Sequence, residues 1–178
     1  IDESADNVAL TIKRANKIYT SCIDGLSKHD IDLLKKGKKG ITKLDNEVEE
    51  LKDNIFYFIK NLDDSSVGAS NFYITVLNYL QDMTQSLDYI AKASYKHVNN
   101  NHKKLRFNQI KDLKEMDYSM AFLFSEITKV FVNKDYAGLT PLIIKKQDLF
   151  AQINEKIQKQ VARTRGDESS PKNTALYF

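Results

Sequence analysis

The amino-acid sequence predicts an all-α fold of two tandem antiparallel three-helix bundle units, the second truncated at its last helix. Three observations predict the helical class and the tandem arrangement. Only two of the 178 residues are proline and six are glycine, a composition that favours long helices. Apolar residues recur in steps of three and four along most of the chain. Two stretches about a hundred residues apart share one pattern, which indicates two copies of one helical unit.

The repeat is clearest before the last helix of each unit. Asp64-Ser65-Ser66 precedes Tyr73 by seven residues, and Glu168-Ser169-Ser170 precedes Tyr177 by the same distance, which gives an offset of 104. Four upstream positions correspond at an offset of 105, namely Asp30, Leu34, Leu44 and Val48 with Asp135, Leu139, Leu149 and Ile153. We therefore expect a first unit at residues 1–100 and a second at 101–178.

The first predicted helix runs from about Ser4 to Ser27. Its apolar stripe consists of Val8, Ile12, Ala15, Tyr19, Cys22 and Leu26. Lys28-His29-Asp30 ends this helix, and Asp30 is a suitable N-cap for the next one because its carboxylate can accept from free backbone N–H groups.

The second predicted helix runs from about Ile31 to Leu62 and carries a seam of heptad type. The seam consists of Leu34, Ile41, Leu44, Val48, Leu51, Ile55, Phe58 and Leu62. Gly37 and Gly40 interrupt the pattern, and each costs about 1 kcal/mol relative to alanine. A kink or a close backbone contact is therefore expected there.

The third predicted helix follows an Asp63–Ser66 turn and runs from about Val67 to His97. We expect it to bury Phe72, Val76, Tyr79 or Leu80, Met83, Leu87 and Ile90. Asn99-Asn100-Asn101-His102 is rich in residues that tolerate turns, and it predicts the boundary between the units.

The second unit begins with a helix from about Phe107 to Val132. Its inward residues are expected to be Ile110, Leu113, Met120, Leu123, Phe124, Ile127, Val130 and Phe131. Asn133-Lys134-Asp135 repeats the earlier break. Thr140-Pro141 predicts the N-cap and first turn of a fifth helix, which ends at Gly166-Asp167-Glu168.

The fifth helix is expected to turn Leu142, Ile143, Leu149, Ile153, Ile157 and Val161 inward. Ser170-Pro171 then opens a sixth helix that reaches only Phe178. The short sixth helix predicts an apolar groove that other chains can fill. Because the pattern is already under way at Ile1, the chain is interpreted as a piece of a larger protein.

Composition limits the classes of function. The net charge of +3 comes from interleaved basic and acidic residues, which argues against a dedicated nucleic-acid binder. The lone Cys22 forms no internal disulfide, so a reducing compartment is expected and metal–thiolate chemistry is not. No apolar run approaches the ~20 residues of a membrane span, and no signal peptide is visible.

Few residues indicate chemistry. Asp45, Glu49 and Asp53 repeat at i and i+4 on one face and could hold a hard cation if another helix supplied oxygens. The favoured interpretation is a solvated acidic face that includes Glu47 and Glu50. The three histidines, His29, His97 and His102, lie at or near helix ends. They are interpreted as partners in local hydrogen bonds or as helix C-terminal charges rather than as metal ligands. No catalytic motif is found, so neither an enzyme, a cofactor nor a metal is predicted.

Two basic sets lie on corresponding helices. The first is Lys35, Lys36, Lys38 and Lys39, and the second is Lys145, Lys146, Lys156, Lys159, Arg163 and Arg165. Because the two helices correspond in the repeat, we expect the two basic sets to lie on similar faces of their helices. These faces could contact anionic lipid headgroups or phosphate. Ordinary solvated lysine is the favoured alternative.

Several stretches together carry a family resemblance. They are Lys13-Arg14-Ala15-Asn16-Lys17, Leu44-Asp45-Asn46-Glu47-Val48-Glu49-Glu50-Leu51, Lys52-Asp53-Asn54-Ile55, His97-Val98-Asn99-Asn100-Asn101-His102-Lys103 and Asn173-Thr174-Ala175-Leu176-Tyr177. In these the chain resembles the PhoU family of phosphate-uptake regulators. It is more closely similar to the cytoplasmic C-terminal PhoU-like domain of bacterial inorganic phosphate transporters.

The resemblance implies a regulatory and assembly domain that acts by docking. Its partners would be a membrane-embedded phosphate permease domain preceding Ile1 in the same parent chain, a second copy, and the anionic surface of the cell inner membrane on its cytoplasmic side. PhoU proteins bind metal through Glu-x-x-x-Asp motifs. Glu49 and Asp53 have that form, but the corresponding pair on the third helix falls at Gln81 and Gln85, so no metal site is carried over. A free-standing PhoU-like metal-binding regulator and a structural helical adaptor are the alternatives.

Overall fold

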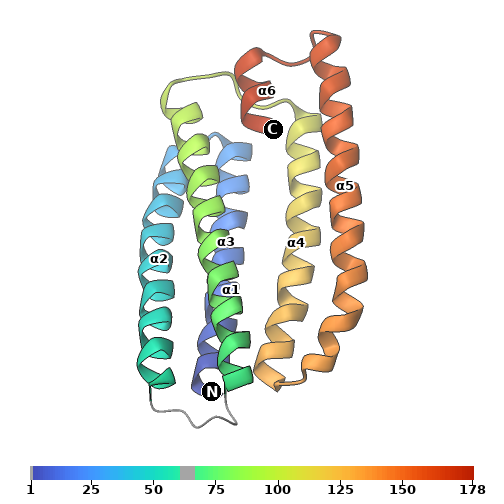
Figure 1. Cartoon of the computed structure of the whole chain (residues 1–178). Coiled ribbons are helices and arrows are strands. Elements are labelled where there is room, and N and C mark those ends of the chain that lie inside the picture. The colour runs from blue at the N-terminus through green and yellow to red at the C-terminus, as the bar shows by residue number, and fades with distance from the viewer. Residues whose placement is uncertain (1, 61–66) are drawn as a thin grey trace.

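The computed structural model describes residues 2–60 and 67–178, and within these ranges the chain is all-α with no strand (Figure 1). This confirms the predicted helical bundle. The elements are α1 (Asp2–Lys28), α2 (Ile31–Ile59), α3 (Val67–Asn99), α4 (Phe107–Asn133), a 3-10 turn η2 (Tyr136–Gly138), α5 (Leu139–Arg165) and α6 (Pro171–Tyr177). The predicted Asp63–Ser66 turn and Leu62 lie outside the described residues.

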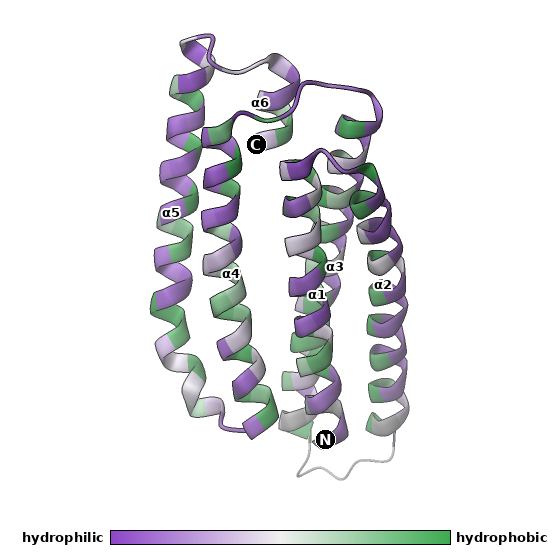
Figure 2. Ribbon diagram, turned by 180° about the vertical axis from the view of Figure 1, so that it is seen from behind, coloured by the Kyte–Doolittle hydropathy of each residue, from purple (hydrophilic) through white to green (hydrophobic). Residues whose placement is uncertain are grey.

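The helices form a three-helix bundle joined to a helical hairpin. Helices α1, α2 and α3 pack on one another in an up-down-up order, and α4 packs along α1. Helix α5 contacts α4, while the short α6 lies between α5 and α3 at the end where α3 finishes (Figure 1). Hydrophobic and hydrophilic patches alternate along each long helix (Figure 2), as expected of helices with one buried face.

The core of the first bundle follows the predicted stripes. All six stripe residues of α1 are buried, as are Leu34, Ile41, Leu44, Val48 and Ile55 of α2. Helix α2 continues through both glycines. A Cβ at Gly37 would lie 3.3 Å from the Cys22 sulfur, and one at Gly40 would lie 3.3 Å from Ile18. The glycines therefore allow close approach of α1 and α2. This confirms the predicted close backbone contact rather than a kink.

The predicted buried face of α3 is partly wrong. Phe72 is exposed, and of the two alternatives Leu80 rather than Tyr79 is buried. The buried residues of α3 include Tyr73, Leu77, Leu80, Thr84, Leu87 and Ala91. These residues recur every three or four positions, so they share one face. The pattern was hidden because this face includes a threonine and an alanine. Thr84 tolerates burial because its hydroxyl donates to the Gln81 carbonyl oxygen at 2.8 Å.

Contacts between α1 and α4 hold the bundle and the hairpin together. The Thr20 hydroxyl donates to Asp117 at 2.9 Å. Near the other end, the ring of Tyr136 lies edge-on to Phe72 and Phe131, and its hydroxyl is 3.1 Å from that of Tyr73. Of the predicted inward residues of α4, Val130 and Phe131 are buried, and the other six are half-buried.

The turns after α1 and α4 share one backbone feature. His29 and Lys134, 105 residues apart, both adopt left-handed conformations with φ of 53° and 54°, a common way to end a helix. Asp30 caps α2 as predicted, since its Oδ1 accepts from the Asp32 and Leu33 amides at 3.0 and 3.2 Å. The predicted Thr140 cap is wrong, because η2 leads directly into α5 and Gly138 is the N-cap.

The predicted inward face of α5 needs the largest correction. Leu142 and Leu149 are buried, but Ile143, Ile157 and Val161 are 53%, 40% and 46% exposed. Helix α5 packs against α4 on one side. The adjacent side carries these residues, and α6, which also packs against α5, has only seven residues.

Candidate functional site

A polar network joins α4, α5 and α6 where these helices meet. The Asp112 carboxylate accepts from the Arg163 guanidinium at 2.9 Å and from the Tyr177 hydroxyl at 3.1 Å. The Lys156 ammonium lies 2.6 Å from Glu115 and 3.6 Å from Asp112. Two acids and two bases therefore balance, so the buried Asp112 and Lys156 both have partners of opposite charge, as buried charges require.

Two buried glutamines extend this network to the start of α6. The Gln109 amide donates to Gln160 at 3.2 Å and to the Ser169 hydroxyl at 2.9 Å. The Gln160 amide donates to the Thr174 hydroxyl at 3.4 Å. Because both glutamines are at most 1% exposed, their satisfied hydrogen bonds fix where α6 begins.

The α6 start itself follows from local sequence. Ser170 is the N-cap, and its hydroxyl accepts from the Asn173 amide at 3.2 Å, as predicted. Pro171 occupies the first turn, where a missing N–H costs nothing. The buried Asn173 side chain donates to the Lys104 carbonyl at 3.2 Å, which ties α6 to the loop before α4.

The electrostatics of the network favour a fixed structure over proton transfer. Burial first, and then the Asp112 carboxylate, raise the pKa of Tyr177 well above its usual value. The hydrogen bond from Lys156 lowers the pKa of Glu115. Burial alone would lower the pKa of Lys156, but Glu115 and Asp112 outweigh it and raise this pKa. Glu115 and Lys156 therefore stay charged, and the Tyr177 phenol stays neutral, at neutral pH.

An apolar groove opens beside the network, between the first bundle and the α4–α5 hairpin. Its volume near α6 is about 270 Å³. The lining residues come from five helices and include Ile23, Ile90, Met116, Ile153, Ile157 and Phe178. Lys156 also lines it, but this ammonium is paired with Glu115. The groove therefore presents an almost uncharged wall.

The groove face continues along α5. Ile143, Phe150, Ile157 and Val161 are all at least 40% exposed and lie within one side of the helix by their spacing. We call these four residues the α5 stripe. A set of large apolar side chains gathered on one helix face is typical of a surface that contacts another protein.

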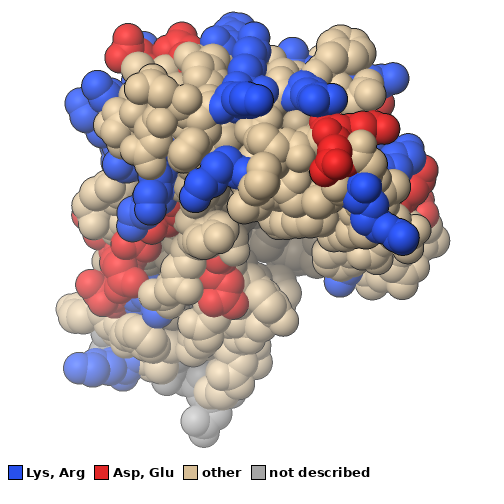
Figure 3. All heavy atoms as spheres, turned by 90° about the horizontal axis from the view of Figure 1, so that it is seen from above, with Lys and Arg blue, Asp and Glu red and all other residues tan. Residues whose placement is uncertain are grey.

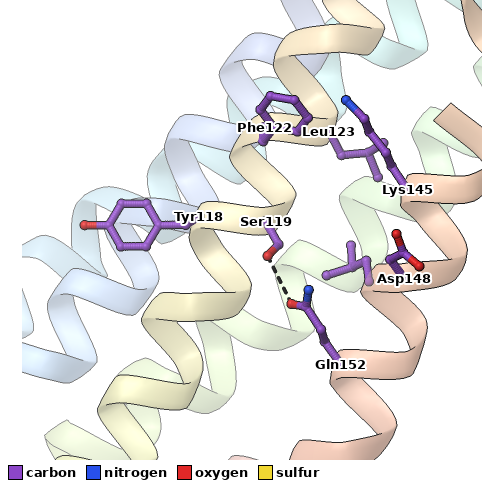
Figure 4. Close-up of a pocket in the computed structure, with 8 residues that line it drawn as sticks. Tyr118, Ser119, Phe122, Leu123, Lys145, Asp148 and Gln152 are labelled. Carbon is purple, nitrogen blue, oxygen red and sulfur yellow. Dashed lines mark hydrogen bonds between the residues drawn. The ribbon is translucent and has the colours of Figure 1, made fainter. Parts of the chain in front are cut away.

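A second hollow, of about 380 Å³, lies between α4 and α5 and includes Tyr118, Phe122 and Asp148 in its lining (Figure 4). The Lys145 ammonium lies 4.0 Å from the centre of the Phe122 ring. The Ser119 hydroxyl donates to the Gln152 side-chain oxygen at 3.1 Å (Figure 4). An amide cannot act as a general base for that serine, so this contact provides no activated nucleophile.

The acidic face of α2 pairs with α3 and α1. The Lys52 ammonium donates to Gln81 at 2.7 Å, and the Gln81 amide donates to Glu49 at 3.0 Å. Arg14 forms an ion pair with Glu47. Asp53 and Glu50 are exposed. Within the described ranges, no three histidine, cysteine or carboxylate side chains converge as metal ligands would.

The second predicted basic set does not form one surface patch. Lys35 to Lys39 lie at the end of the molecule where α2 begins, and Lys145 and Lys146 lie at the opposite end (Figure 1). Lys156 and Arg163 are not surface groups, because they face α4 and pair with Asp112. Lys156 and Arg163 were wrongly predicted to be surface cations, because the carboxylates of α4 that face them were not recognised.

Another basic surface lies at the end that carries α6. Lys103, Lys104, Arg106 and Lys172 are exposed there. Lys and Arg side chains form several groups over this end, while Asp and Glu lie in others (Figure 3).

The histidines and the cysteine have local structural roles. The His97 ring nitrogen Nε2 bonds the Lys103 carbonyl at 2.9 Å, which closes the loop after α3. The ring of His102 lies 5.2 Å from that of His97. Burial, followed by the charges of His97 and Lys172, lowers the pKa of His102. Cys22 is fully buried, and burial raises its pKa to about 11.

Sequence reasoning missed Gln109, Asp112, Lys156 and Gln160, because polar residues were assigned to the surface. A signal was present. Lys156 and Arg163 continue the seven-residue spacing of Leu142 and Leu149, which puts them on the side of α5 that faces α4.

No helix within the described ranges is both long and apolar enough to cross a membrane. Comparisons with protein-family models, with curated proteins and with solved structures find no match to this chain.

Proposed function

We propose that this chain is a regulatory and assembly domain of an inorganic phosphate transporter, and that it acts on the cytoplasmic side of the membrane by docking. The observation that carries the docking mode is the open apolar groove with the α5 stripe beside it. The link to phosphate transport comes from the resemblance to the PhoU-like domains.

Two of the stretches behind that resemblance meet in space. His97 holds the loop after α3 through the Lys103 carbonyl, and Asn173 holds α6 through the Lys104 carbonyl. Leu176 and Tyr177, which belong to the second of these stretches, line the groove. This supports the proposal, since residues that carry the resemblance shape the surface to which the function is assigned.

The mechanism is differential binding. A partner helix that buries the groove in one transporter conformation, and not in another, shifts the population toward the first. Couplings of this kind change affinity or activity by about 5- to 150-fold. The groove needs no catalytic group for this, and the polar network under α6 keeps its walls in place.

The basic end assists by orienting the domain. Lys103, Lys104, Arg106 and Lys172 are exposed on it, and a cation near an anionic leaflet contributes about 1 kcal/mol. The alternative of a metal-binding regulator would need carboxylates from several helices to meet. Here Gln81 of α3 instead bonds both Glu49 and Lys52 of α2.

The test is uptake of radiolabelled phosphate by the source cells after replacement of the gene with an Ile157→Glu version. Burying a carboxylate in an apolar contact is costly, so we expect the initial rate of uptake to change about fivefold or more. Ile144→Glu is the matched control, because Ile144 is 64% exposed on α5 but lies outside the stripe. Unchanged uptake in the Ile157→Glu cells, with the protein present at normal level, would reject the proposal.

A further inference from the structure

We propose that the hollow between α4 and α5 is a binding site for a free α-amino acid with an apolar side chain. We call it the α4–α5 hollow. Its polar lining includes Ser119, Lys145, Asp148 and Gln152 (Figure 4). None of its lining residues also lines the apolar groove, and none belongs to α6. The site is therefore separate from the docking surface proposed above.

The internal repeat shows how this hollow arises. The offset of 105 relates Ser119 and Gln152 to Arg14 and Glu47, which form an ion pair between α1 and α2. The equivalent hollow of the first bundle has a volume of only about 140 Å³, against about 380 Å³ between α4 and α5. A serine replaces the long arginine, so the space that the guanidinium fills in the first bundle is left open.

The distance between the helices enlarges the hollow further. Gly37 and Gly40 allow α1 and α2 to approach closely, and the same offset places Leu142 and Lys145 at these positions of α5. Side chains there do not permit an equally close approach of α5 to α4. The resulting volume of about 380 Å³ lies within the range of about 300–1,000 Å³ that is usual for small-molecule sites.

The helix that completes a unit does not cover this face. In the first bundle, the equivalent hollow is lined by residues of α1 and α2 and by no described residue of α3. The Arg14 and Glu47 side chains remain 43% and 22% exposed there. The α4–α5 hollow is therefore open because of its position in the unit, and not because of the length of α6.

The charged groups of the hollow suit a zwitterion. Within the described ranges, neither the Lys145 ammonium nor the Asp148 carboxylate forms an ion pair. The ammonium instead lies 4.0 Å from the centre of the Phe122 ring. Residues at i and i+3 of a helix have Cβ atoms about 5–6 Å apart. An amino acid carries its carboxylate and its ammonium on one carbon, so Lys145 can bind the first while Asp148 binds the second.

Neutral groups complete the site. The Ser119 hydroxyl donates to the Gln152 side-chain oxygen at 3.1 Å, which orients that amide and leaves its nitrogen to donate to a ligand oxygen. Leu123 and Leu149 also line the hollow and can cover an apolar ligand side chain. The carboxylate of Asp148 disfavours a ligand that carries only negative charge, such as a nucleotide, because like charges repel.

Titration of the isotope-labelled chain with L-phenylalanine, followed by two-dimensional NMR, tests the site. Because an open hollow gives a ligand of about a dozen atoms only modest affinity, we expect a Kd on the order of 1 mM. The amide signals of Ser119, Lys145 and Gln152 should shift and saturate, while those of Arg14 and Glu47 should not move. Phenylpropanoate, which lacks the ammonium, and phenylethylamine, which lacks the carboxylate, should each bind about tenfold more weakly or worse.

Variants separate the site from the rest of the surface. Asp148→Asn and Lys145→Gln should each weaken binding about tenfold or more, whereas Lys146→Gln, which changes a neighbouring cation outside the hollow, should leave the Kd unchanged. A double variant, Ser119→Arg with Gln152→Glu, restores the ion pair of the first bundle and should abolish binding. Far-UV circular dichroism checks that each variant remains helical, which we expect because all five positions are exposed or half-buried.

Three outcomes would overturn the proposal: no saturable shift up to about 20 mM L-phenylalanine, equal affinity for phenylpropanoate, or undiminished binding by the double variant. Shifts spread evenly over the exposed aromatic residues would mean non-specific contact and would overturn it as well. None of these outcomes bears on the proposed function, because that function is tested at Ile157 in the groove.

Discussion

Replacement of Asp112 by alanine tests whether the polar network holds α4, α5 and α6 together. Its side chain is 9% exposed and bonds both Arg163 and Tyr177, with Lys156 nearby. Removal leaves two cations with a single acid, Glu115. Breaking a buried pair from one side typically costs about 3–5 kcal/mol. Because Glu115 still neutralises Lys156, we expect a loss near the lower limit, about 3 kcal/mol.

Urea unfolding followed by far-UV circular dichroism measures this loss as a lower midpoint at unchanged slope. In a thermal scan the same loss corresponds to about 6–12 °C, since a chain of this size shifts by about 2–4 °C per kcal/mol. Glu115→Gln is the matched control. Glu115 is 48% exposed in its side chain, so solvent screens its ion pair and Glu115→Gln should cost much less than Asp112→Ala.

Tyr177→Phe separates the hydroxyl from the ion pairs. It removes only the hydrogen bond to Asp112, worth about 1 kcal/mol. The reasoning is refuted if Asp112→Ala costs less than about 1 kcal/mol, or if Glu115→Gln costs as much as Asp112→Ala. Either result would mean that Asp112 is solvated and that the network contributes little to the junction.

Two further substitutions follow from local geometry. A Cβ at Gly25 would lie 2.7 Å from Leu34, whereas one at Gly68 meets nothing within 4 Å. Thermal melts should therefore show that Gly25→Ala is less stable by about 1–3 kcal/mol and that Gly68→Ala is more stable by about 0.5 kcal/mol. The reverse order of stability would contradict the packing. Burial raises the pKa of Asp117 despite its bond from Thr20, so the folded state binds a proton more readily than the unfolded state, and this group's contribution to stability falls as pH rises through that raised pKa. Asp117→Asn keeps an oxygen that can accept from Thr20 and removes the partly buried charge. The urea midpoint of this variant should therefore rise at pH 7 and not at pH 3. A variant that is less stable than the unsubstituted chain at pH 7 would contradict the sign of this effect.

The fold class and the helix boundaries were predictable because the signals are local. Asp30 and Ser170 cap the helices they precede, and the α1 stripe is buried throughout. The buried face of α3 was harder to predict. Thr84 and Ala91 are poor markers of burial. The prediction therefore followed the more hydrophobic Phe72, which is exposed.

The environment of α5 could not be predicted from its own pattern. An apolar residue on a helix turns inward only where another element covers it, and that depends on partners elsewhere. Ile157 and Lys156 are neighbours in sequence, yet the isoleucine is exposed and the lysine is buried. The lysine is buried because Asp112 and Glu115 of α4 face it, a long-range pairing that periodicity alone does not reveal.

Thiol labelling at Phe150 in the source cells tests most directly whether the exposed stripe of α5 is a contact surface. Phe150→Cys places a thiol on the stripe, and Cys22 does not compete because it is buried with a pKa of about 11. With a membrane-permeable maleimide we predict slow labelling of Phe150→Cys, which a docked partner covers, and fast labelling of Ile144→Cys, which lies outside the stripe and is 64% exposed. Equally fast labelling at both positions would contradict the assignment of the stripe as the docking surface.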